Sequence, residues 1–134
     1  MNQQAHACVA VDIVVPCYHE EEALPETHRQ LSTLMSGLRR SGQISADSKI
    51  YYVDDGSRDG TWELIAALSE ADDSVVGIRL SRNYGHQSAL LAGLFSATGD
   101  AVITVDAAGA RVGAAEDVPA AAAADHDARR VSIA

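Results

Sequence analysis

The sequence predicts an α/β fold with a mainly parallel sheet of four strands and three helices. Short runs of apolar, often β-branched residues alternate along the chain with longer segments whose apolar residues recur every three or four positions. Each of the four apolar runs is followed at once by polar or charged residues. Strands that alternate with helices run parallel, so we expect these polar residues to share the edge of the sheet where ligands bind.

The first strand is expected over residues 9–15, where β-branched residues dominate and Pro16 stops the run. The first helix is expected over residues 20–38, because its apolar residues fall on one face. The three glutamates at 20–22 and Pro25 suit a first turn, where the helix dipole favours acidic groups.

The remaining elements alternate in the same way. Strands are expected over residues 49–53, 75–80 and 101–105, and helices over residues 61–71 and 87–97. The resulting order, βαβαβαβ, implies right-handed crossovers between parallel strands.

Composition restricts the class of protein. At 134 residues the chain holds one domain at most. Its net charge of −9 argues against binding nucleic acid, which needs a basic face. Cys8 and Cys17 have no metal-ligand spacing, so free thiols are favoured over a nucleophile or a disulfide. Without a signal peptide or a long apolar run, we expect a cytoplasmic, soluble chain.

The C-terminal segment differs from the rest of the chain. Residues 107–134 contain 12 alanines and no Leu, Lys or aromatic residue, and they sustain no apolar face. We interpret this segment as a disordered or loosely docked tail from a frameshifted or artificially terminated end, with a genuine low-complexity C-terminus as the alternative. The expected organisation is an N-terminal tail at 1–8, a domain at 9–106 and this tail.

Candidate binding residues stand at the ends of the first two strands. Pro16 ends its strand rigidly, Tyr18 can lie over a flat base, and Glu20 follows near a helix start. Asp54 and Asp55 repel each other, so one is expected to face a ligand while the other caps a neighbouring element. In both places a well-capped strand end without ligand remains the alternative.

The third and fourth strand ends add charge of both signs. Arg82 can pair with a diphosphate or balance the negative charge of Asp54 and Asp55. His86 borders the expected site. Asp106 can hold a divalent cation that bridges to a diphosphate, or cap its strand. Neither a G-x-G-x-x-G motif nor a phosphate-binding G-x-x-x-x-G-K-[ST] loop is present, so a dinucleotide fold and a phosphate-loop NTPase are not expected.

Four segments in this order resemble the family-2 glycosyltransferases. They are VVPCYHEEE at 14–22, YVDDGSRDGT at 52–61, LSRNYGHQSAL at 80–90 and ATGD at 97–100. The closest branch resembles the polyprenyl-phosphate sugar transferases, the relatives of dolichol-phosphate mannose synthase. The resemblance covers residues 9–106 and implies a truncated, nucleotide-sugar-binding half-domain of the GT-A, Rossmann-like kind.

The resemblance also implies roles for single residues. Pro16, Tyr18 and Glu20 would surround the base and ribose of the donor. Val53 and Asp55 would contact the base. Arg82 matches a basic position of the family only approximately.

Metal binding is implied by one further match. Asp106 matches the first aspartate of the family's Asp-x-Asp motif, which holds ribose or a Mg²⁺- or Mn²⁺-diphosphate. The second aspartate would stand at position 108, which is alanine here.

The resemblance implies transfer of a sugar from a UDP- or GDP-sugar to an acceptor, plausibly a polyprenyl phosphate at the cytoplasmic face of the membrane. Because the acceptor half of the family pattern is missing after Asp106, we expect this chain to be inactive by itself. The alternative is a non-catalytic nucleotide-binding or interaction domain.

Overall fold

The computed structural model describes residues 9–107, 112–115 and 130–133, the last two ranges as backbone only. The expected N-terminal tail, Cys8 and positions 108–111 and 116–129 lie outside the described residues. Within the described part, no helix is long and apolar enough to cross a membrane.

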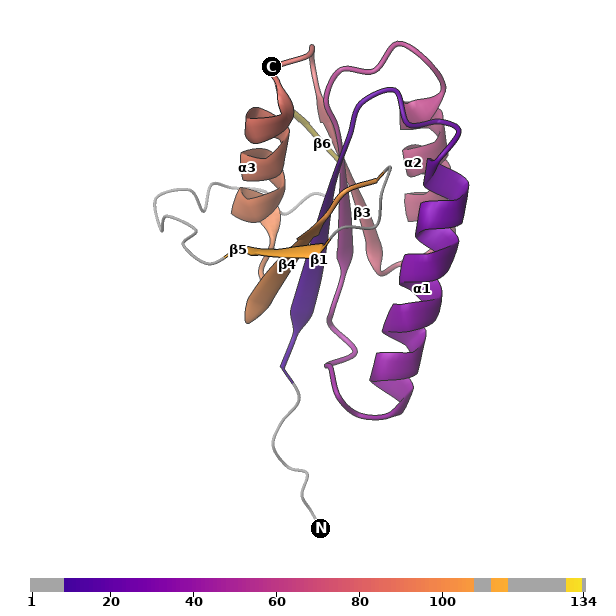
Figure 1. The fold of residues 1–134 in the computed structure, drawn as a ribbon, viewed down its shortest axis with the longest axis vertical. Coiled ribbons are helices and arrows are strands. Elements are labelled where there is room, and N and C mark those ends of the chain that lie inside the picture. The colour runs from indigo at the N-terminus through magenta and orange to yellow at the C-terminus, as the bar shows by residue number, and fades with distance from the viewer. Residues whose placement is uncertain (1–8, 108–111, 116–129, 134) are drawn as a thin grey trace.

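Four parallel strands form the centre of the sheet (Figure 1). They are β1 (Val11–Cys17), β2 (Ile50–Asp54), β3 (Val75–Leu80) and β4 (Ala101–Val105). In space their order is β4-β1-β2-β3. The strand order therefore reverses between β1 and β4, and this is the place where open α/β sheets bind ligands.

Three helices cover the two faces of the sheet. α1 (Leu24–Arg40) and α2 (Thr61–Ala71) lie on one face, and α3 (His86–Ser96) lies on the other (Figure 1). Each face has its own apolar core, one centred on Tyr52 and Ile65 and the other on Val53 and Ile78. The predicted α/β class, with a parallel four-stranded sheet and three helices, is confirmed.

β1 continues through Pro16 to Cys17, two residues beyond the predicted end. The Ile13 N–H donates to Lys49 O on the β2 side, at 2.9 Å. Backbone groups alternate in direction along a strand, so the Pro16 nitrogen faces β4. Pairing with β4 ends at Val14, so the missing N–H of Pro16 breaks no ladder bond.

α1 begins at Leu24, four residues later than predicted, so the glutamates at 20–22 precede the helix. The Glu20 carbonyl accepts the Leu24 N–H at the start of α1, and both Glu20 and Glu21 also bind the region where the β2–α2 loop meets α2. The Glu20 N–H donates to Thr61 Oγ1 at 2.9 Å, and Glu21 Oε1 accepts the Gly60 N–H at 2.7 Å. The Glu21 carboxylate is therefore used in a tertiary hydrogen bond and not in the first turn of α1, whereas Glu20 contributes its backbone N–H.

Two short strands complete the sheet at its edges. β5 (Val112–Ala115) pairs antiparallel with β4, and β6 (Arg130–Ile133) pairs parallel with β3. The sequence pattern predicts neither strand, because the alanine-rich segment lacks strand-forming periodicity. An edge strand exposes free backbone groups that can pair with any extended segment, whatever its side chains. The frameshift interpretation of the segment stays a prediction.

A buried carboxylate outside the predicted site ties the opposite edge of the sheet together. Asp12 on β1 is 1% exposed. Its Oδ1 accepts the Lys49 N–H at 3.0 Å, and its Oδ2 accepts the N–H groups of Thr98 and Gly99 at 3.0 and 2.7 Å. Burial raises the pKa of Asp12, and these backbone donors oppose the shift. Asp12 thus joins the starts of β2 and β4 to β1.

Candidate functional site

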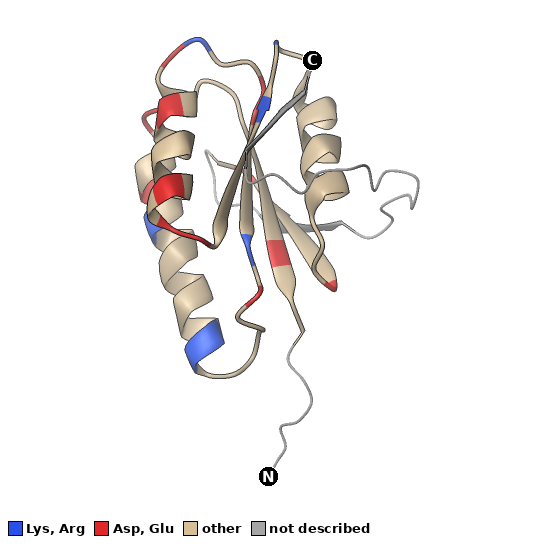
Figure 2. Cartoon of the chain, turned by 180° about the vertical axis from the view of Figure 1, so that it is seen from behind, with Lys and Arg blue, Asp and Glu red and all other residues tan. Residues whose placement is uncertain are grey.

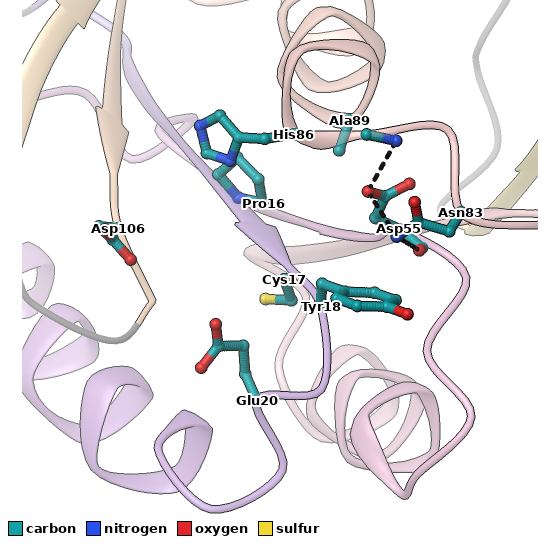
Figure 3. Close-up of a pocket in the computed structure, with 10 residues that line it drawn as sticks. Pro16, Cys17, Tyr18, Glu20, Asp55, Asn83, His86, Ala89 and Asp106 are labelled. Carbon is teal, nitrogen blue, oxygen red and sulfur yellow. Dashed lines mark hydrogen bonds between the residues drawn. The ribbon is translucent and has the colours of Figure 1, made fainter.

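A pocket of about 280 Å³ opens at the carboxyl ends of β1 and β4, beside the first turn of α3 (Figure 3). This is the point where the strand order reverses. Its lining residues come from all four strand ends: Pro16, Cys17, Tyr18, Glu20, Asp55, Asn83, Gly85, His86, Ala89 and Asp106.

Five of the eight predicted site residues line this pocket: Pro16, Tyr18, Glu20, Asp55 and Asp106. The other three lie elsewhere. Val53 is fully buried in the core beneath α3, and Asp54 is fully buried at the end of β2. Arg82 lies outside the lining, with its guanidinium 4.8 Å from the centre of the Tyr84 ring.

Two carboxylates face the same space on one side of the pocket. Glu20 comes from the β1–α1 loop and Asp106 from the end of β4, and Figure 3 shows both pointing into the opening. Partial burial raises the pKa of Glu20, and the negative charge of Asp106 raises it further. The Thr27 hydroxyl on α1 donates to Ala107 O at 2.6 Å and so fixes the chain next to Asp106. The arrangement favours a cation between the two carboxylates.

Asp55 organises the opposite wall. Its Oδ1 accepts the Tyr84 N–H at 2.8 Å, and its Oδ2 accepts the Gly85 N–H at 3.1 Å. The Asn83 side-chain amide donates to the same carboxylate at 3.2 Å (Figure 3). Of the two adjacent aspartates, Asp55 therefore binds the loop before α3 while forming part of the pocket wall.

The loops that carry these groups approach each other closely. Gly56 has a φ of +74°, and a Cβ at this position would lie 2.3 Å from the carbonyl carbon of Arg82. Gly85, with a φ of +104°, allows the chain to turn into α3. Both glycines are required by the backbone, and they keep the Asp55 contacts in place.

Asp54 and Cys17 lie side by side on neighbouring strands. Burial raises the pKa of Asp54, against hydrogen bonds from Ser57, and its Oδ2 has no hydrogen-bond partner among the residues that the structure describes. Burial and the surrounding carboxylates raise the pKa of the Cys17 thiol well above its usual value. A nucleophilic cysteine needs a lowered pKa, so the surroundings of Cys17 favour the neutral thiol, which forms part of the pocket wall.

Sequence reasoning missed four lining residues: Cys17 as part of the wall, Asn83, Gly85 and Ala89. Asn83 and Gly85 stand in the same segment after β3 as Arg82, and the polar side chain of one and the turn-forming character of the other are the sequence signals for them. His86, which the sequence places at the border of the site, does line the pocket. Ala89 gives no sequence signal, because only the packing of α3 brings it there.

The charge of the pocket limits what it can bind. Among the described residues, its lining includes three carboxylates and no Lys or Arg. Figure 2 shows Lys and Arg scattered among Asp and Glu over the described part of the chain. Those described residues contain no group of three His, Cys, Asp or Glu that could hold a metal by itself. Glu20 and Asp106 nevertheless suit Mg²⁺ or Mn²⁺, which need only one or two carboxylates when phosphates and waters complete the shell.

An open α/β sheet with a pocket at its switch point defines a class of ligand-binding α/β domains, and comparison with known proteins narrows the class. Residues 12–107 match the glycosyl transferase family 2. An uncharacterised glycosyltransferase of Bacillus subtilis (strain 168), YkoT, is 50% identical over 97 residues. That match covers 71% of this chain and 29% of the relative.

Solved structures agree on the fold. The mannosyltransferase PcManGT from Pyrobaculum calidifontis, in complex with GDP-Man and Mn²⁺, superposes with a TM-score of 0.60 at 22% identity, over 75% of this chain and 28% of that one. Residues 1–349 of TarS from S. aureus give a TM-score of 0.56 at 22% identity, over 73% and 27%. A complex of the same TarS fragment contains UDP. The chain belongs to glycosyl transferase family 2 and has the GT-A fold.

Proposed function

We propose that the pocket binds the nucleoside diphosphate of a UDP- or GDP-sugar together with Mg²⁺ or Mn²⁺, and that the complete protein transfers the sugar to an acceptor. The observation that carries the proposal is the meeting of Tyr18, Glu20 and Asp106 in one pocket at the switch point of the sheet. Family membership and the nucleotides bound by the structural neighbours support it.

The base is assigned to the side of the pocket formed by Pro16 and Tyr18. Tyr18 is 40% exposed and offers an aromatic face on which a flat base can stack. The Asp55 carboxylate already accepts the N–H groups of Tyr84 and Gly85. Asp55 therefore acts on the base chiefly by keeping this wall in position.

The diphosphate is assigned to the side with Glu20 and Asp106. An anionic diphosphate would be repelled by these carboxylates unless a divalent cation lies between them. When bound, the cation neutralises the charge that develops on the leaving diphosphate. Asp106 is the proposed metal ligand, and Thr27 on α1 holds the adjoining residue, Ala107, in place.

A polyprenyl phosphate at the cytoplasmic face of the membrane is the proposed acceptor of the complete protein. Such a phosphate is already ionised, so its oxygen needs little help from a general base to attack the anomeric carbon. The enzyme's contribution is then positioning and charge stabilisation. The chain spans about 29% of the length of YkoT, and we propose that by itself it binds nucleotide without transferring sugar.

Binding can be located by following backbone amide signals in NMR spectra while UDP or GDP is added with Mg²⁺, which avoids the paramagnetism of Mn²⁺. Shifts are expected at residues 17–20, 83–89 and 106, and not at the opposite edge around Asp12. Shifts confined to another surface, or no shifts at millimolar nucleotide in a folded sample, would contradict the proposed site.

A sugar-transfer assay distinguishes a chain that transfers sugar from one that only binds the nucleotide. We expect no transfer from UDP-glucose or GDP-mannose to polyprenyl phosphate by this chain, although it binds the nucleotide. Transfer above background would show that residues 1–134 suffice for catalysis and would overturn the binding-only part of the proposal.

A further inference from the structure

The side chains that line the described part of the pocket offer many hydrogen-bond acceptors and few donors. The carboxylates of Glu20, Asp55 and Asp106 only accept hydrogen bonds when they are ionised. A diphosphate is also an acceptor, so its oxygens are matched by N–H and O–H groups as well as by a cation. The side chains that carry such a hydrogen therefore decide where the pocket can hold a diphosphate.

Most of these donors are already used within the chain. The Asn83 amide nitrogen donates to Asp55 O and to Asp55 Oδ2, both at 3.2 Å, which uses both of its N–H groups. The Cys17 thiol donates to a main-chain carbonyl of its own strand at 3.4 Å. Tyr18 keeps its hydroxyl, but Figure 3 shows that group at the far end of the phenol ring, pointing away from Glu20.

His86 is the remaining donor among the described lining side chains. It is an exposed residue, and its ring forms no hydrogen bond or ion pair with another described residue. In either tautomer the neutral imidazole carries one N–H. Figure 3 shows the ring on the same side of the picture as Glu20 and Asp106, whereas Asp55 and Asn83 lie together on the other side. The free N–H is therefore at the end of the pocket to which the diphosphate is assigned.

The chain that carries His86 is held in place. Asp55 accepts the N–H groups of Tyr84 and Gly85 at 2.8 and 3.1 Å, and Gly85 then turns the chain into α3. His86 is the first residue of this helix, and Ala89, three residues later, is buried and lines the same pocket. Residues three apart share one face of a helix, so α3 turns the face with His86 and Ala89 to the pocket.

We propose that the His86 ring donates a hydrogen bond to the diphosphate of the bound nucleotide. The proposal rests on the proposed function, which assigns the diphosphate to the side of Glu20 and Asp106. Arg82, the basic residue expected to pair with the diphosphate, stacks on Tyr84 outside the lining and leaves this task open. The ring is assigned to phosphate oxygens and not to the cation, because Mg²⁺ prefers oxygen ligands.

The test measures the affinity for UDP and GDP with Mg²⁺ by calorimetry, at one pH, in the unmodified chain, His86→Leu and His86→Gln. Leucine removes the donor, whereas glutamine keeps an N–H at a similar reach. We expect His86→Leu to weaken nucleotide binding about tenfold, the effect of losing one hydrogen bond to a charged group, and His86→Gln to keep most of the affinity. Unchanged affinity in His86→Leu, or equal losses in the two variants, would overturn the proposal.

Gln87→Leu is the matched control. Gln87 is exposed and lies outside the described lining of the pocket, so this variant makes the same change in side-chain character one residue away. We expect it to bind nucleotide as the unmodified chain does. A loss as large as that of His86→Leu would assign the effect to the start of α3 as a whole and would overturn the role of the ring.

A second readout locates the part of the nucleotide that meets the ring. The ¹⁵N signals of the His86 ring in the unmodified chain should shift with Mg²⁺ and inorganic pyrophosphate, which is a diphosphate without a base. They should shift less with uridine at the same concentration. No response to pyrophosphate, or a larger response to uridine, would overturn the assignment to the diphosphate.

The proposed function and the role of His86 fail in different ways. If neither UDP nor GDP binds to the folded, unmodified chain with Mg²⁺, the proposed function fails and the role of His86 fails with it. If a nucleotide binds and His86→Leu binds it equally well, the proposed function stands and only the role of His86 fails.

Discussion

At the scale of single residues, the site depends on carboxylates with different tasks. Asp55 is only 3% exposed and accepts three hydrogen bonds from the loop before α3. Glu20 and Asp106 instead face the opening of the pocket. Adjacent acidic residues in the sequence cannot reveal this division, because it depends on which backbone N–H groups the fold brings near each of them.

Replacing Asp55 by alanine should lower the free energy of unfolding by about 1–3 kcal/mol, because buried N–H groups lose their acceptor. Urea denaturation measures the change. Asp47→Ala is the matched control, since Asp47 is exposed, and its effect should stay within about 0.5 kcal/mol. Equal stability of the two variants would show that the Asp55 contacts contribute nothing to the fold.

His28 gives the fold a pH dependence of its own. Its Nδ1 lies 2.8 Å from the Tyr52 hydroxyl, and burial lowers the pKa of His28 below its ordinary value. The unfolded chain therefore binds this proton first as the pH falls. The stability associated with His28 is complete above about pH 6.5 and decreases as the pH falls from there toward the lower pKa of the folded state.

The substitution His28→Gln removes the titrating group and keeps a polar partner for Tyr52. We expect the difference in unfolding free energy between pH 7.5 and pH 5 to be smaller in this variant than in the unmodified chain. Urea denaturation at the two pH values provides the comparison. An identical pH dependence in the two chains would show that folding does not lower the pKa of His28.

At the scale of elements, local sequence patterns predict the bounds of a helix or strand correctly where no tertiary contact shifts its ends. α2 has both predicted bounds, 61–71, and β3 has both predicted bounds, 75–80. α1 starts late because Glu20 and Glu21 bind Thr61 and Gly60, which follow about 40 residues later in the chain. The pairing of β5 and β6 depends on the free edges of the sheet and leaves no periodic pattern in the sequence.

Thr27 tests how α1 supports the site. Thr27→Val removes the hydroxyl that donates to Ala107 O but keeps the shape of the side chain. We expect the Mn²⁺-dependent gain in nucleotide affinity to decrease by about 3- to 10-fold, with little change in metal-free binding. Thr27→Ser keeps the hydroxyl and should retain the gain. Equal losses in both variants would assign the effect to packing instead of the hydrogen bond.

At the scale of the whole molecule, five of the eight predicted site residues meet because parallel strands end at a common edge. The common edge of parallel strands does not determine which side chains at that edge point into the apolar core and which face the pocket. Val53 and Asp54 stand at the correct edge, yet both are fully buried. Arg82 follows β3 as predicted but stacks on Tyr84 outside the pocket lining.

The charge of the chain makes the cation central to the proposed function. With a net charge of −9 and no Lys or Arg among the pocket-lining residues that the structure describes, binding of a diphosphate should depend on a divalent cation. Asp106→Asn should therefore lower nucleotide affinity in the presence of Mn²⁺ and change it little in EDTA.

The most direct test is the affinity of the unmodified chain for UDP and GDP by calorimetry, with Mn²⁺ and with EDTA, on a sample shown to be folded by a cooperative melt. We predict binding of at least one nucleotide with Mn²⁺ and at least tenfold weaker binding in EDTA. No binding at millimolar nucleotide with Mn²⁺, or equal affinity with and without the cation, would contradict a metal-dependent donor site.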